Sequence, residues 1–152
     1  MRISAKVDYA VRAAIELAGA DRGTPVKGDR IAAAQDIPMK FLENILSELR
    51  RAGLVGSRRG TDGGYWLARP AAKVTIADII RAVEGPLANV QGVRPEELEF
   101  IGSAVPLQRM WVCVRASLRS VLEHVTLADL VAGTLPSKVS KLADDPDAWS
   151  PR

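Results

Sequence analysis

The sequence predicts a mainly α-helical fold with one small β-hairpin. Apolar residues recur at helical spacing in several segments of the chain. Two short strand-like runs, 54–59 and 65–68, flank the glycine-rich stretch 60–64, which is the pattern of a hairpin. The chain has 152 residues, of which 47% are hydrophobic. This length and composition suit one soluble domain with an appendage, able to form a core without disulfides.

Three helices are expected before the hairpin. Residues 7–18 carry apolar side chains along one side, and a turn-forming stretch at 21–25 ends this helix. A short, weakly signalled helix follows at 28–34. The third begins at Pro38, a residue that the first turn of a helix tolerates, and ends near Gly53.

The third helix has two distinct faces. Its apolar residues follow the spacing of a core-facing stripe: Leu42, Ile45, Leu46 and Leu49. Its polar residues repeat the same spacing on another face: Lys40, Glu43, Asn44 and Ser47. The polar face is either simply solvated or a surface that reads DNA, because Lys, Asn and Glu pair with base edges in the major groove.

The hairpin carries Arg58 and Arg59 at its tip, directly before Gly60. Arginines there either improve solubility or enter a narrow minor groove, whose negative potential attracts them. Three helices followed by a hairpin with a basic tip form a winged helix-turn-helix, predicted here over residues 1–85. That combination favours DNA binding over a merely solvated surface.

Two capping-box patterns mark helix starts after the hairpin. Thr75 and Asp78 begin a fourth helix that ends at Gly85, and Thr126 and Asp129 begin a short last helix. Between them, residues 86–105 read as a loop. Residues 106–135 are predicted to hold a long dimerisation helix and the short last helix, and 136–152 a polar, mobile tail.

The long helix carries a heptad-like apolar seam, a pattern suited to packing against one partner helix. The seam residues are Leu107, Trp111, Val114, Leu118, Val121 and Val125. The seam either joins two copies in a homodimer or forms a core stripe within one chain. We favour the homodimer, because the helix follows an already complete winged domain.

Charge and cysteine content narrow the function classes. Residues 1–70 hold 12 Lys and Arg against 8 Asp and Glu, whereas the whole chain has a net charge of +3. The positive charge is therefore concentrated in the predicted winged domain, which suits a polyanionic partner. The chain lacks an apolar run long enough for a transmembrane helix and begins without a signal-peptide core, so we expect a cytoplasmic protein with no membrane partner.

Enzymatic activity is not expected. The chain has one cysteine, Cys113, and one histidine, His124, with no nucleophile in register with that histidine and no set of residues that would form a metal cluster. A lone histidine is interpreted as a surface residue, and Cys113 as a buried structural residue rather than a redox switch.

Several stretches together resemble the Rrf2 family of winged-helix transcription regulators. They are IPMKFLENIL at 37–46, LRRAGLV at 49–55, SRRG at 57–60, GGY at 63–65, and the shorter DYA at 8–10, AVEGP at 82–86 and TLADL at 126–130. The resemblance covers about residues 1–133. It implies a homodimer that binds an imperfect palindrome near promoters and represses or activates transcription; we favour a repressor.

The resemblance also implies roles for individual residues. It assigns Met39, Lys40, Glu43 and Asn44 to the major groove. It assigns the hairpin tip, with Arg58, Arg59 and Gly60, to the minor groove. Physical chemistry agrees, since an asparagine can hydrogen-bond adenine twice and a glutamate can accept from cytosine. Lys27, Arg50 and Arg51 are better placed as phosphate contacts, which position a protein without reading sequence.

The chain departs from the sensor members of that family. Those members hold an iron–sulfur cluster with three cysteines in the loop before the long helix, but residues 85–105 contain none. Asp8 matches a non-cysteine ligand of some members, and a carboxylate without thiolates cannot hold iron and sulfide. We therefore predict no cluster, no metal and no cofactor. The alternative is a smaller set of ligands shared across the dimer, for which Cys113 of each copy is the only thiolate source. The sequence does not identify a small-molecule or protein effector. If a small ligand binds, its site is expected where the loop meets the long helix, near Val90, Phe100, Ile101 and Trp111.

The alternative function is a winged-helix module that docks a partner protein, because a fold does not determine a function. The cysteine-free loop and the acidic tail are its motivation. Against it stands the joint presence of the basic hairpin tip and the polar helix face, which a protein without a DNA partner does not need.

Overall fold

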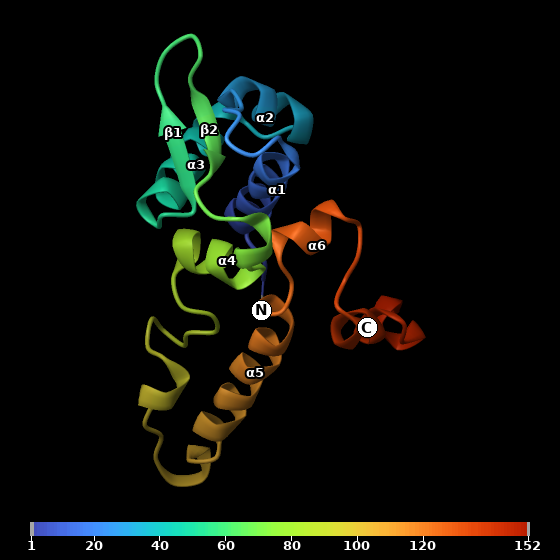
Figure 1. Ribbon diagram of the computed structural model, residues 1–152. Helices are drawn as coiled ribbons and strands as arrows, with labels where there is room; N and C mark the ends of the chain where they lie inside the picture. The colour runs from blue at the N-terminus through green and yellow to red at the C-terminus, as the bar shows by residue number, and fades with distance from the viewer. Residues whose placement is uncertain (1, 152) are drawn as a thin grey trace.

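The computed structural model describes residues 2–151 as a helical body with a projecting hairpin at one end and a long helical arm at the other (Figure 1). The helices and strands, in chain order, are α1 (Ala5–Gly19), α2 (Gly28–Gln35), α3 (Met39–Arg51), β1 (Val55–Arg58), β2 (Gly64–Leu67), α4 (Ile76–Glu84), α5 (Leu107–Leu122), α6 (Leu127–Val131) and α7 (Ser137–Ala143). The predicted mainly α-helical class with a small hairpin is confirmed.

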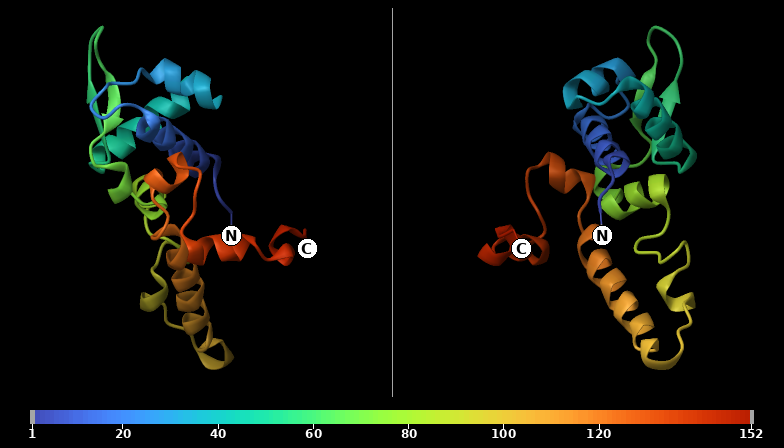
Figure 2. Two further views of the ribbon diagram at one scale, coloured as in Figure 1. Left: turned by 45° about the vertical axis from the view of Figure 1, so that its right-hand side comes forward. Right: turned by 180° about the vertical axis from the view of Figure 1, so that it is seen from behind.

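The body is built from α1, α2, α3, α4 and α6, and α5 extends away from it (Figures 1 and 2). Residues 86–105 run beside α5, and the short 3-10 helix Pro95–Glu97 in this segment packs against it. The hairpin and the tip of α5 therefore lie at opposite ends of the molecule.

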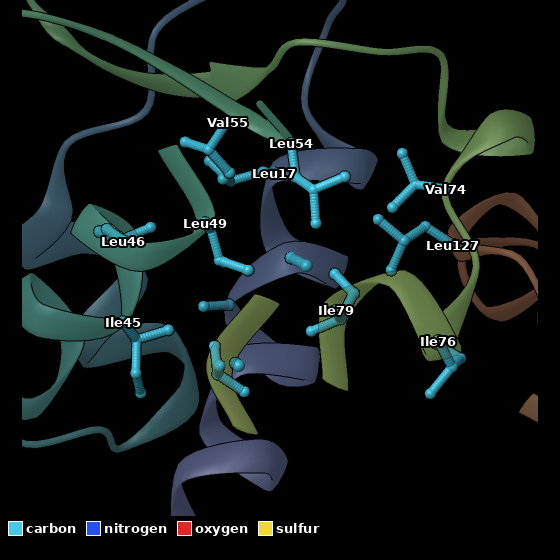
Figure 3. Close-up of a cluster of buried hydrophobic side chains, with 14 of the residues drawn as sticks. Leu17, Ile45, Leu46, Leu49, Leu54, Val55, Val74, Ile76, Ile79 and Leu127 are labelled. Atoms are coloured by element: carbon cyan, nitrogen blue, oxygen red, sulfur yellow. The ribbon is translucent and has the colours of Figure 1, made fainter. Parts of the chain in front are cut away.

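The core lies where α1, α3, α4 and the start of the hairpin meet (Figure 3). The predicted apolar stripe of α3 is confirmed, because each of its four leucine and isoleucine side chains is at most 1% exposed. Burying a leucine or isoleucine side chain contributes roughly 1.5–3 kcal/mol. This stripe fixes which face of α3 remains outside.

The hairpin is a two-stranded antiparallel sheet in which Val55 faces Leu67 and Arg58 faces Gly64. We call residues 55–67 the wing. Its turn needs glycine at position 63, since a Cβ atom there would lie 2.1 Å from the carbonyl oxygen of Arg58. The tight turn keeps the two strands close up to the arginine-bearing tip.

Both capping boxes form as the sequence predicts, with the Thr75 and Thr126 hydroxyls accepting from the backbone N–H groups of Asp78 and Asp129. The two helix starts also lie side by side. The N–H of Ile76 donates to the carbonyl of Val125 at 3.0 Å. This hydrogen bond attaches the chain to the helical body again after α5, which extends away from it.

The structure corrects the assignment of one residue of the predicted seam. Val125 is 5% exposed and belongs to the core of its own chain, not to a face of α5. The heptad spacing continues past Leu122, where α5 ends, so periodicity alone could not show where the helix stopped.

The tail also differs from expectation. Residues 137–143 form helix α7, and Val139 is 8% exposed, although 136–152 were expected to be polar and mobile. The apolar side chains of Val139 and Leu142 lie with Val121 around one pocket. The charged residues that follow hide this short apolar signal in the sequence.

Candidate nucleic-acid interface

α2, α3 and the wing lie together at the end of the molecule remote from the tip of α5 (Figure 1). The predicted DNA-contacting residues are all exposed there: Lys27, Met39, Lys40, Glu43, Asn44, Arg50, Arg51, Arg58, Arg59 and Gly60. The structure thus brings the two predicted groups, helix face and hairpin tip, to one end of the protein.

On the polar face of α3, Ser47 accepts a hydrogen bond from Arg51, and the other three side chains have no such partner among the described residues. Within residues 2–151, the side chains of Lys40, Glu43 and Asn44 form no hydrogen bond or ion pair. Because α3 buries only its opposite stripe, these donors and acceptors point away from the core. They can pair with base edges without breaking an existing contact.

The two wing arginines differ in their surroundings. A guanidinium nitrogen of Arg58, Nη2, donates to the carbonyl of Asp62 at 2.9 Å, across the turn. Arg59 has no hydrogen-bond or ion-pair partner among the described residues. Arg59 is therefore the tip arginine whose guanidinium is available to another molecule.

The residues expected to contact phosphates also make contacts within the protein. The ammonium of Lys27 donates to the carbonyl of Gly60 at 2.9 Å, and Arg50 donates to the hydroxyl of Ser57 at 3.1 Å. Arg51 reaches Ser47 one turn earlier, at 3.4 Å. Lys27 and Arg50 thereby connect α2 and α3 to the wing, a role that sequence analysis did not anticipate.

Sequence analysis also missed an exposed aromatic residue on α3. Phe41 is 58% exposed and meets the ring of Tyr9 edge-on, with 6.3 Å between ring centroids. The guanidinium of Arg12 lies 4.9 Å from the centroid of that Tyr9 ring. The sequence did contain a signal for this exposure, because Phe41 lies outside the apolar stripe of α3.

The arm formed by α5 has no buried residue in the single chain. Leu107, Trp111, Val114, Leu118 and Val121 are only half-buried. The preceding segment, residues 86–105, packs against this helix, and its Glu96 forms an ion pair with Arg115 of α5. The pKa of Glu96 is lowered, first by a hydrogen bond from its own backbone N–H and then by Arg115.

Cys113 is exposed, which corrects the expectation that it is buried. With 3.6 residues per turn, the spacing that gathers Trp111, Val114 and Leu118 turns Cys113 to a different side of α5. His124 is exposed, as expected.

An apolar cavity of about 470 Å³ opens where the start of α1 meets α4 and α5. Its lining includes Ile3, Ile80, Leu87, Leu118 and Leu122. These are not the residues predicted for an effector site, and one of that predicted set, Ile101, is 90% exposed.

In the part of the chain that the structure describes, no helix is both long and apolar enough to span a membrane.

Together these features define a winged helix-turn-helix protein of the DNA-binding class. The Rrf2 family model, described as "Iron-dependent Transcriptional regulator", matches residues 3–133. The chain belongs to the Rrf2 family and is a DNA-binding transcriptional regulator.

Several named proteins share this sequence and fold. The chain is 52% identical over 145 residues to a Mycobacterium tuberculosis protein named as an HTH-type transcriptional regulator, covering 95% of this chain and 90% of the relative. It is 37% identical over 135 residues to the HTH-type transcriptional regulator CymR of Bacillus subtilis, covering 88% and 92%. The relatives are thus named as regulators of transcription rather than as enzymes.

Solved structures agree with this assignment. The structure of CymR, the global cysteine regulator of B. subtilis, superposes with a TM-score of 0.73 at 36% identity, over 88% of this chain and 98% of that one. IscR of T. potens gives a TM-score of 0.69 at 33% identity, over 100% and 93%.

The iron in the family description does not fit the donors of this chain. Iron–sulfur clusters are held mainly by cysteine thiolates, and the sequence has the single cysteine Cys113, on α5. Among residues 2–151, no three His, Cys, Asp or Glu side chains gather where they could hold a metal. One thiolate per chain is fewer than the cysteines by which such clusters are generally held.

Proposed function

We propose that this protein is a sequence-specific repressor that binds a palindromic operator as a homodimer, without an iron–sulfur cluster. The observation that carries the proposal is that Lys40, Glu43 and Asn44 on α3, and Arg59 at the wing tip, are exposed and have no side-chain partner among the described residues. Polar side chains without internal partners, on a helix held firmly by its other face, suit recognition of another polar surface.

The proposed contacts divide into those that read bases and those that position the protein. Met39, Lys40, Glu43 and Asn44 read base edges in the major groove. Arg59 enters the minor groove, where a narrow groove concentrates negative potential. Arg50 and Arg51 lie around these readers and contact phosphates, whereas Arg58 lies with Arg59 at the minor groove.

The homodimer is proposed to form through α5. A single chain leaves Leu107, Trp111, Val114, Leu118 and Val121 only half-buried, and a second copy of the same helix offers a matching apolar face. Two-fold symmetry would set the recognition helices, α3 of each copy, about 34 Å or a multiple apart along the DNA. Occupation of a promoter by such a dimer excludes the transcription machinery.

Selection of bound duplexes from a random DNA pool tests the proposal. The wild-type protein should enrich a palindromic sequence, and Asn44→Ala should lose the preference at one position of each half-site. Lys141→Ala, a matched removal of one polar side chain on the distant helix α7, should enrich the same sequence. A protein that binds all duplexes weakly and equally would overturn the proposal, and would do so decisively if it bound a protein partner stoichiometrically.

The absence of a cluster has its own test. Protein purified without oxygen should show no visible absorption bands of iron bound to sulfide. Such bands, together with stoichiometric iron, would overturn that part of the proposal.

A further inference from the structure

Lys27 occupies the N-cap position of α2 and does not serve as a cap. Its backbone is extended, with φ −67° and ψ 140°, and its side chain makes no capping hydrogen bond. Ser, Thr, Asp and Asn are preferred at this position because their oxygens accept from free N–H groups, which an ammonium cannot do. A positive charge there also opposes the helix dipole. Lysine is thus a poor local choice for α2.

The side chain is instead directed to the tip of the wing. Its ammonium donates to the carbonyl of Gly60 at 2.9 Å, across 33 positions of sequence. The same carbonyl accepts from the backbone N–H of Gly63 at 3.0 Å. Gly60 has φ +101°, a conformation that favours glycine. Two donors therefore hold the carbonyl at the turn.

Val26, the residue before Lys27, is joined by backbone hydrogen bonds to strand β2 of the wing, near its turn. Val26 and Tyr65 exchange two N–H···O bonds, both 2.8 Å long. A Cβ atom at Gly64 would lie 2.6 Å from the carbonyl oxygen of Val26, which shows how closely the two backbones approach. Residues 26 and 27 thus contact the wing at two points, the turn-side end of β2 and the tip.

We propose that Lys27 is a positioning residue that holds the wing tip in its DNA-binding orientation. Arg59 precedes Gly60 directly and has no other anchor among the described residues, so fixing Gly60 limits where Arg59 can point. A preset side chain loses less conformational freedom on binding. The inference rests on the proposed function, because it assigns Lys27 an action through Arg59 on DNA.

A double-mutant cycle between positions 27 and 59 tests this inference. The probe is the duplex that the wild-type protein selects from a random pool. Lys27→Met should weaken binding about two- to tenfold, the range expected for one lost hydrogen bond, and Lys27→Arg, which keeps a donor, should restore most of the affinity. In an Arg59→Ala background, Lys27→Met should have little further effect. Arg30→Met removes a nearby charge that has no wing contact. Its effect on DNA affinity should instead be the same with and without Arg59→Ala, so that the two changes are additive.

Lys27→Ser separates positioning from a general role in folding. Serine is a good N-cap, so this variant should unfold at a higher temperature than the wild type and yet bind the selected duplex more weakly. A purely structural lysine would not give these opposite changes.

Three results would overturn the inference. The first is an equal loss of DNA affinity from Lys27→Met in the presence and in the absence of Arg59, which indicates an independent phosphate contact. The second is no loss of affinity from Lys27→Met. The third is a Lys27→Ser protein that binds the duplex as tightly as the wild type. If the wild-type protein selects no duplex, the proposed function fails, and this inference fails with it. A wild type that binds normally while the cycle is additive rejects this inference alone.

Discussion

The ammonium of Lys6 lies 2.8 Å from a carboxylate oxygen of Glu48, which joins α1 to α3, the proposed recognition helix. The same ammonium donates to the carbonyl of Val83, near the end of α4, at 2.7 Å. That Glu48 oxygen is shielded from solvent and has no well-oriented hydrogen bond among the described residues, so the ion pair is what offsets its burial. One lysine therefore holds three helices in register beneath the DNA-facing surface.

Lys6→Met should lower the free energy of unfolding by about 1–2 kcal/mol, because it leaves a shielded carboxylate without its partner. Urea denaturation followed by circular dichroism measures this change. Lys73→Met, at an exposed lysine without a side-chain partner among the described residues, is the control and should have little effect. Equal stabilities of the two variants would contradict the role of Lys6.

Arg59→Ala should weaken operator binding by about 1–3 kcal/mol and reduce the slope of log affinity against log salt by about one. The reason is that Arg59 is the tip arginine with no partner within residues 2–151. Fluorescence anisotropy of a labelled duplex at several salt concentrations gives both quantities. Lys141→Ala serves as the charge-matched control, and an unchanged salt slope for Arg59→Ala would exclude Arg59 from the interface.

Leu118→Glu should convert the proposed dimer to monomers, because it places a carboxylate in the half-buried seam of α5. Sedimentation equilibrium measures the mass, and circular dichroism verifies that the variant remains helical. Ser120→Glu adds the same charge at an exposed position away from the seam and should remain dimeric. A folded, dimeric Leu118→Glu protein would show that α5 is not the interface.

Glu123→Gln should lower the melting temperature at neutral pH but not in acid. The pKa of Glu123 is lowered chiefly by the hydrogen bond from Arg81, and also by Arg119, whose Nε lies 2.9 Å away. A carboxyl group whose pKa falls on folding stabilises the protein above its ordinary pKa, and this contribution is lost as the pH falls through the lowered value. The melting temperatures of wild type and variant should therefore converge at acidic pH. Glu97→Gln, at an exposed residue, is the control, and a pH-independent gap would contradict the mechanism.

Local patterns were sufficient to predict the elements that carry the site. The stripe of Leu42, Ile45, Leu46 and Leu49 fixes the orientation of α3, and the two threonine capping boxes fix where α4 and α6 begin. Each of these signals lies within a few residues of sequence, where helix geometry and hydrogen-bonding rules apply directly.

Contacts between distant residues could not be predicted in this way. Lys27 and Gly60, or Lys6 and Glu48, meet only after the helices have packed. A lysine in a basic segment gives no sign whether its ammonium faces solvent or a carbonyl. The same limit explains Val125, whose place in a heptad pattern was visible but whose burial against α4 depends on the chain turning back after α5.

The exposed thiol of Cys113 makes spectroscopic study of the intact protein straightforward. With no second cysteine in the chain, a nitroxide reagent attaches at a single point on α5, away from the wing. In an assembly of two copies, the two labels carry one unpaired electron each, and their magnetic coupling reports the distance between the two α5 helices. A movement of these helices on DNA binding would appear as a change in that distance.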